Sequence, residues 1–185
     1  LRGGSAPRYN PWWEGQSFVN SFIERPHFLN ILRKQLSLKE ITLLSGLRRV
    51  GKTTLMKLCV EYLLKTKKIP PSRIFYFSLD DYLTAKNSIL EIIEEYRKLH
   101  KLSYREIVFL FLDEVTYKSD FELQLKNLYD YQNVKIIAAS SSASMLRNKK
   151  PHLTGRQRLL EVQPLDFEEY LQFRKIHVPR SDSHL

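Results

Sequence analysis

The sequence predicts a three-layer α/β/α fold built around a mainly parallel, five-stranded sheet. Two observations lead to this prediction: strand-like and helix-like segments alternate along most of the chain, and the strand-like segments are apolar throughout. A strand with both faces buried reads as a continuous apolar run, which is typical of parallel sheets covered by helices on both sides. The 185 residues are enough for one such domain and few for two.

Five apolar segments of strand length follow one another along the chain. They are residues 40–45, 73–79, 107–112, 134–139 and 158–162. Polar clusters come directly after four of them, at residues 46–53, 80–81, 113–114 and 140–142. Because ligands of open parallel sheets bind at the carboxyl ends of the strands, these clusters predict a binding site at one edge of the sheet.

The other segments carry apolar residues at helical spacing. Predicted helices cover residues 18–36, 53–63, 89–99 and 121–131, and a last one begins after Asp166. The first is interrupted at Arg25, because a residue that precedes proline is biased away from helix. The last carries Asp166 and Glu169 at the spacing of a capping box.

The composition is that of a soluble, basic protein with a formal net charge of +10. This charge favours anionic partners such as nucleotides, but the basic residues are scattered as on solvated helix ends and loops, so a nucleic-acid partner stays open. The longest apolar run, residues 107–112, is far shorter than the roughly 20 residues that cross a bilayer, so we expect no membrane partner. The single cysteine, Cys59, indicates a reducing compartment such as the cytoplasm.

Both ends of the chain are expected to be irregular. Residues 1–16 are rich in Gly, Pro and Arg and form an N-terminal arm, which begins without methionine as a processed end or an added segment would. The arm lacks the apolar core of a secretory signal. Trp12 and Trp13 could form an exposed recognition patch, although packing of the arm onto the domain is favoured. Residues 177–185 have little apolar content and are expected to form a flexible tail.

A glycine-rich segment follows the first predicted strand and fits the phosphate-loop pattern G-x-x-x-x-G-K-[ST]. Its glycines permit a backbone whose N–H groups point inward, and the next helix adds its positive dipole end. We expect Lys52 to reach the β- and γ-phosphates and Thr53 to ligate Mg²⁺. The predicted nucleotide-binding residues are Gly46, Arg48, Arg49, Val50, Gly51, Lys52, Thr53 and Thr54. Arg48 and Arg49 occupy variable positions, where a solvated loop face is the simpler alternative.

A buried strand that ends in Asp113-Glu114 supplies the second anchor that a magnesium–nucleotide site needs. Asp113 is expected to hold Mg²⁺ together with Thr53, and Glu114 to orient and deprotonate an attacking water. Acidic residues at a strand end could be plain surface groups, but beside a phosphate loop this alternative is disfavoured. Asp80 and Asp81 could position water or metal, with helix capping as an equal alternative.

Two further residues are candidates for catalytic groups. Ser141, after the fourth strand, is placed to sense the γ-phosphate or the water, and a serine-rich turn that caps a helix is the alternative. Arg156 lies in a predicted loop and could act as an arginine finger from its own or a neighbouring subunit, against the alternative of a surface arginine. Adenine is favoured over guanine, since residues 148–151 have proline where a guanine-reading motif has a carboxylate.

Six segments of the chain, in order, resemble the ATPase core of prokaryotic AAA-like P-loop ATPases that carry a C-terminal domain of unknown function: GLRRVGKTTL, RIFYFSLDD, FLFLDEV, KIIAASSSASML, LTGR and QPLDFEEYL. The resemblance covers about residues 25–173 and implies binding and slow hydrolysis of MgATP, with Arg25-Pro26 near the adenine. It departs at residues 139–142, where the usual Thr-Gly-Ser-Ser reads Ala-Ser-Ser-Ser. Family chains continue beyond the last segment, so we expect residues 17–176 to form an isolated ATPase domain without its C-terminal effector domain.

Two functions from different classes compete on this reading. The first is an ATPase in which Glu114 activates water. The second is a nucleotide-dependent switch or nucleic-acid-binding module that holds ATP with little turnover, and a small-molecule kinase is a distant third. Intact Glu114 favours the ATPase, whereas the altered segment at residues 139–142 and the short chain favour the switch. An oligomer is compatible with either function.

Overall fold

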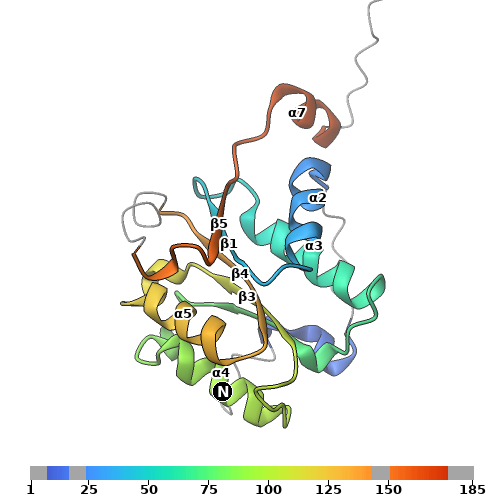
Figure 1. The fold of residues 1–185 in the computed structure, drawn as a ribbon. Helices are drawn as coiled ribbons and strands as arrows, with labels where there is room; N and C mark the ends of the chain where they lie inside the picture. Colours follow the sequence, from blue (N-terminus) through green and yellow to red (C-terminus); the bar gives the residue numbers. More distant parts are fainter. Residues whose placement is uncertain (1–7, 17–23, 143–150, 175–185) are drawn as a thin grey trace, which may run out of the picture.

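The computed structural model describes residues 8–16, 24–142 and 151–174, and its five strands form one parallel sheet with the order β2–β3–β4–β1–β5 (Figure 1). The strands are β1 (Ile41–Ser45), β2 (Ile74–Ser78), β3 (Val108–Asp113), β4 (Val134–Ser140) and β5 (Gln157–Glu161). Each begins and ends within one residue of its predicted range. The predicted α/β fold class, with a five-stranded parallel sheet, is therefore confirmed.

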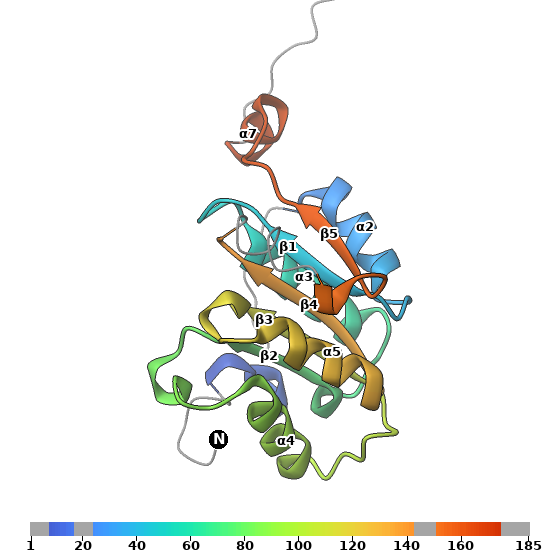
Figure 2. The same cartoon turned by 60° about the vertical axis from the view of Figure 1, so that its left-hand side comes forward.

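Helices cover both faces of this sheet (Figures 1 and 2). They are α2 (Pro26–Gln35), α3 (Lys52–Lys65), α4 (Ile89–Leu99), α5 (Phe121–Tyr131) and α7 (Phe167–Phe173). One core cluster packs α4 and α5 against the sheet, and a second packs α2 and α3 against its other face. Short 3₁₀ helices are η1 (Pro11–Glu14), η2 (Pro71–Arg73), η3 (Tyr82–Thr84), η4 (Val115–Tyr117) and η5 (Pro151–Leu153). No helix in the described parts of the chain is long and apolar enough to span a bilayer.

The predicted helix boundaries agree with the structure where they can be compared. The proline after Arg25 begins α2, and the earlier part of that predicted helix, residues 18–23, lies outside the described residues. At the start of α7 the Glu169 N–H donates to Asp166 Oδ1 at 2.8 Å, and the Asp166 N–H donates to Glu169 Oε2 at 3.1 Å. This reciprocal pair is the predicted capping box. In both views α7 projects beyond the sheet (Figures 1 and 2).

The N-terminal arm packs against the outer edge of β2 through side chains. The amide of Asn10 accepts from the Tyr76 N–H at 2.7 Å and donates to the Tyr76 carbonyl at 2.9 Å, as a neighbouring strand would. The indole N–H groups of Trp12 and Trp13 both donate to the Ile74 carbonyl, at 3.1 and 3.0 Å. Trp12 is only 6% exposed. The arm therefore packs onto the domain, as the favoured alternative predicts, and the two tryptophans do not form an exposed recognition patch.

The arm also covers His100, which follows α4. The ring of Trp13 lies 4.3 Å from that of His100, and the buried Nε2 of His100 has no hydrogen-bond partner among the described residues. Burial lowers the pKa of His100 below its usual value. The folded chain therefore takes up this proton less readily than the unfolded chain does, so the stability from neutral His100 is present above the unfolded pKa of about 6.5 and is lost as the pH falls from there through the lower folded pKa.

We accordingly expect the free energy of unfolding to fall between about pH 7.5 and about pH 5.5, and to fall less in a His100→Phe variant, which keeps a ring but cannot be protonated. Urea unfolding of the two chains at both pH values measures this difference. Equal slopes with pH would contradict the assignment to His100.

Candidate functional site

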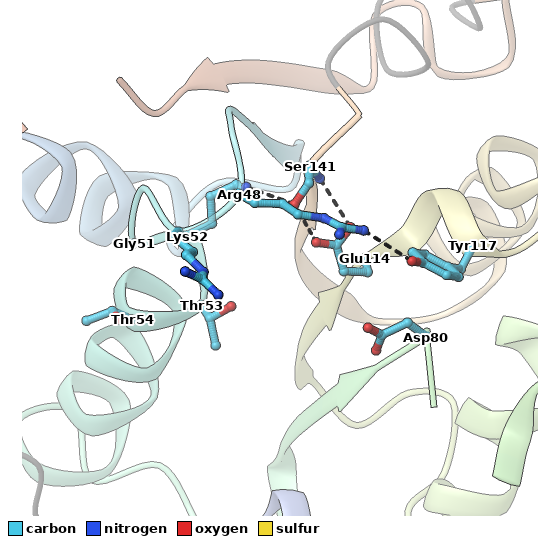
Figure 3. Close-up of a pocket in the computed structure, with 10 residues that line it drawn as sticks. Arg48, Gly51, Lys52, Thr53, Thr54, Asp80, Glu114, Tyr117 and Ser141 are labelled. Carbon is cyan, nitrogen blue, oxygen red and sulfur yellow. Dashed lines mark hydrogen bonds between the residues drawn. The ribbon is translucent and has the colours of Figure 1, made fainter. Parts of the chain in front are cut away.

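A cavity of about 600 Å³ opens at the carboxyl edge of the sheet, where the segments that follow β1, β2, β3 and β4 meet (Figure 3). Its lining residues are Arg48, Arg49, Gly51, Lys52, Thr53, Thr54, Asp80, Glu114, Tyr117 and Ser141. Most of the predicted site residues are in this set. Tyr117, which no sequence motif marks, also lines the cavity, and its hydroxyl accepts a 3.4 Å hydrogen bond from Arg48 Nη2.

Glycine is needed at positions 46 and 51 of the loop for two different structural reasons. Gly51 adopts φ +98° directly before α3, so it turns the chain into the helix in a conformation that favours glycine. Gly46, at φ +145°, does not line the cavity, and a Cβ there would lie 2.4 Å from the carbonyl oxygen of Val162. The Val162 N–H in turn donates to the backbone carbonyl of Ser45 at 2.8 Å. Gly46 thus allows the segment after β5 to approach the loop.

Lys52, the first residue of α3, is a buried cation whose side chain is folded back over the loop and is 5% exposed. Its ammonium donates to the carbonyls of Gly46 and Leu47, both at 2.8 Å, and to Ser141 Oγ at 3.3 Å. Burial lowers the pKa of Lys52, and the nearby carboxylate of Glu114 opposes that shift. A desolvated ammonium whose hydrogen-bond partners are neutral, beside the start of a helix, provides a site for an anion.

Asp113 and Thr53 lie side by side at the end of β3 and the start of α3. The Thr53 hydroxyl donates to Asp113 Oδ2 at 2.5 Å, and the hydroxyl of Tyr76 donates to the same oxygen at 3.0 Å. Oδ1 accepts the backbone N–H of Glu114 at 3.0 Å. A buried carboxylate beside a hydroxyl is the type of oxygen donor set that suits Mg²⁺, so the residues fit the predicted metal.

Glu114 adopts the left-handed conformation, with φ 52° and ψ 44°, and its carboxylate reaches the cavity (Figure 3). Ser141 donates to both carboxylate oxygens, through its hydroxyl to Oε1 at 2.5 Å and through its N–H to Oε2 at 3.1 Å. Positive φ is rare outside glycine and is enriched at functional sites. The structure brings Ser141 to Glu114, while Ser140 accepts the N–H of Ser142 at 3.0 Å, as a turn-capping serine does.

The structure does not bring Arg156 to the cavity of its own chain. Arg156 directly precedes β5, in which Gln157 pairs with Ile41 at the start of β1, whereas the loop follows Ser45 at its end. At about 3.3 Å per residue this separation exceeds about 13 Å. The Arg156 guanidinium instead donates to Asp130 at 3.0 Å. A loop before a parallel strand lies at the amino edge of the sheet, which excludes an arginine finger acting within one chain in this arrangement.

Arg25 also lies away from the cavity lining, and joins three parts of the chain instead. Its Nε and Nη2 donate to the two carboxylate oxygens of Glu169, at 2.7 and 2.8 Å. Its Nη1 donates to the carbonyls of Gln163, at 2.8 Å, and of Val50 in the loop, at 3.2 Å. Val50, a predicted nucleotide-binding residue, is therefore not among the residues that line the cavity, and its carbonyl accepts a hydrogen bond from Arg25 instead.

Comparison with known proteins agrees with this fold. A family model described as an AAA domain matches residues 38–171. An uncharacterized protein of Methanocaldococcus jannaschii is 39% identical over 138 residues, which cover 74% of this chain and 28% of that protein. One of Haemophilus influenzae is 24% identical over 161 residues, which cover 84% of this chain and 39% of that protein. The chain thus spans less than half the length of these relatives.

Among solved structures, the complex of S. cerevisiae Hsp104 with ADP aligns with a TM-score of 0.63 and 20% identity, covering 90% of this chain and 26% of that one. At this identity the likeness concerns the fold alone. The family model, in contrast, spans most of the chain and includes every residue that lines the cavity. The chain therefore belongs to the AAA domain family.

Proposed function

We propose that this chain binds MgATP in the cavity beside α3 and hydrolyses it slowly, and that turnover drives a C-terminal effector domain of the kind that the sequence resemblance implies. One observation carries the proposal: the buried Lys52, the Thr53 hydroxyl and the Glu114 carboxylate line one cavity of about 600 Å³, and Thr53 is hydrogen-bonded to Asp113 behind that lining. A cavity of this size is within the usual range for small-molecule sites.

Each residue has a distinct role in this proposal. Lys52 would exchange its contacts with the loop carbonyls for phosphate oxygens, and Thr53 and Asp113 would hold Mg²⁺. When bound, Mg²⁺ would neutralise charge on the phosphates. Glu114 would accept a proton from the attacking water, which it can do while bonded to Ser141 because a carboxylate offers about four lone-pair sites. Arg156 could contribute only from a neighbouring subunit.

A second candidate function, a nucleotide-dependent switch with little turnover, is favoured by the contact between Ser141 and Glu114. Both oxygens of the proposed base already accept hydrogen bonds from Ser141, at 2.5 and 3.1 Å, so part of the hydrogen-bonding capacity of the carboxylate is used within the protein. In this case nucleotide binding would change the structure of the loop without steady hydrolysis. The change would reach α7 through Arg25, which is bonded both to the Val50 carbonyl in the loop and to Glu169 in α7.

Two measurements on the same chain test the proposal. We expect a dissociation constant for MgATP between about 1 µM and about 1 mM, weaker binding of MgGTP, and phosphate release slower than about 1 s⁻¹. Absence of ATP binding would contradict both candidate functions. Binding without phosphate release, under conditions where a known ATPase registers, would leave the switch.

A further inference from the structure

Among the hydrogen bonds of the described residues, the one from the Tyr76 hydroxyl is the single bond to the Asp113 carboxylate whose donor lies outside the phosphate loop and the β3 segment. This hydroxyl donates to Asp113 Oδ2 at 3.0 Å, in a side chain that is only 4% exposed. We propose that Tyr76 is a positioning residue, which orients Asp113 for Mg²⁺ and so sets the metal dependence of nucleotide binding. This inference rests on the proposed function and extends it to a residue that no motif marks.

The strand register explains why this tyrosine reaches the site. Tyr76 pairs with Phe111, and Asp113 lies two residues further along β3 on the same face of the sheet. Such a diagonal neighbour is within reach of a long aromatic side chain. The flanking Phe75 and Phe77 point to the opposite face and belong to the core under α4 and α5. Of these three consecutive aromatic residues, the one that faces Asp113 carries the hydroxyl.

The backbone of Tyr76 is fixed independently of the metal-binding residues. Its N–H and carbonyl are both bonded to the Asn10 amide of the N-terminal arm, at 2.7 and 2.9 Å. The N-terminal arm thus fixes the backbone of Tyr76, and Asp113 fixes its hydroxyl. A group held in this way can orient a ligand with little further loss of conformational freedom.

Three donors together fix the plane of the Asp113 carboxylate. Glu114 N–H holds Oδ1, and the hydroxyls of Thr53 and Tyr76 hold Oδ2. Thr53 is itself a proposed metal ligand, so Tyr76 is the donor to Oδ2 that has no second role at the site. Partners that orient a metal ligand typically change metal affinity by 10- to 100-fold when removed.

The test compares Tyr76→Phe with Tyr96→Phe, a matched control. Tyr96 is an equally buried tyrosine whose hydroxyl donates to the Ser72 carbonyl at 2.7 Å, in the core on the other face of the sheet. The probe is a fluorescent, non-hydrolysable ATP analogue, bound first in EDTA and then at increasing Mg²⁺. We expect Tyr76→Phe to bind it in EDTA within about two-fold of wild type, but to need at least about 10-fold more Mg²⁺ for half of the metal-dependent gain in affinity. Tyr96→Phe should leave both quantities unchanged.

The outcomes separate this inference from the function on which it rests. A wild-type chain that binds no analogue, with or without Mg²⁺, would overturn the proposed function and the inference together. A wild-type chain with Mg²⁺-dependent binding and a Tyr76→Phe variant with the same Mg²⁺ midpoint would overturn the inference alone. So would equal weakening in EDTA and in Mg²⁺, because a hydroxyl that only supports the fold would not act through the metal. Thermal unfolding of both variants establishes that they are folded.

Discussion

Replacement of Glu114 by glutamine is expected to lower phosphate release from MgATP at least about 100-fold, with the affinity for MgATP unchanged within about three-fold. A positioned general base contributes about 10²- to 10⁴-fold to a reaction rate, and the amide cannot accept the proton. Glutamine keeps the size of the side chain and an oxygen that can accept from Ser141 at the position now held by Oε1. Steady-state phosphate release and analogue binding, measured on the same preparations, give the two quantities.

Asp80 provides the matched control for this change, because it also places a carboxylate in the cavity (Figure 3). Asp80 accepts a 2.6 Å hydrogen bond from Ser78 and has no contact with Asp113 or Ser141 among the hydrogen bonds of the described residues. An Asp80→Asn variant should therefore keep phosphate release within about five-fold of wild type. An equal loss in both variants would assign the effect to the charge of the cavity rather than to a base at Glu114.

Replacement of Arg25 by methionine is expected to lower the free energy of unfolding by about 3 kcal/mol. Removal of one partner from a buried ion pair costs about 3–5 kcal/mol, and the lower end applies here because the Glu169 side chain is 22% exposed. Methionine retains an unbranched apolar side chain, so the loss reflects mainly the carboxylate and the carbonyls of Gln163 and Val50 that are left without their donor. Urea unfolding measures the difference.

Glu169→Gln is the control, since glutamine also serves in a capping box and retains one acceptor for Arg25. It should cost about 1 kcal/mol. The contact with Arg25 lowers the pKa of Glu169, so the stability from this pair is present above the unfolded pKa of about 4.3 and is lost as the pH falls through the lower folded pKa. The difference between wild type and Arg25→Met should accordingly shrink in acid. A difference that stays constant down to about pH 3 would contradict a contribution from this charge pair.

The strands and helices could be predicted because local patterns determine them. Four of the strands lie in mainly apolar runs, and the ends of these runs are marked by Gly46, Asp80, Asp113 and Ser140. The division of the chain into residues 1–16, 17–176 and 177–185 stays a prediction. The pairing order of the strands depends on contacts between distant residues, which the periodicity of a single sequence does not contain.

The predicted site residues fall into two groups for a physical reason. Gly51, Lys52 and Thr53 meet in one cavity because their spacing fixes their positions on a loop and a helix start. Tyr76 could not be predicted as a site residue, since its contact with Asp113 follows from the register of β2 and β3. Arg156 was considered for a catalytic role from its loop position alone, although a residue just before a predicted parallel strand belongs to the edge of the sheet opposite the phosphate loop.

The closure of β2 by side chains has a consequence for solubility. An outer strand with open N–H and carbonyl groups is a template on which another chain can add a strand, and proteins that lack protection there tend to aggregate. Here the protection comes from Asn10, Trp12 and Trp13, which lie before the segment of residues 38–171 shared with the AAA domain family. A chain shortened to that segment would keep every residue of the cavity and expose this edge. The chain therefore needs more residues to stay soluble than it needs to form the binding site.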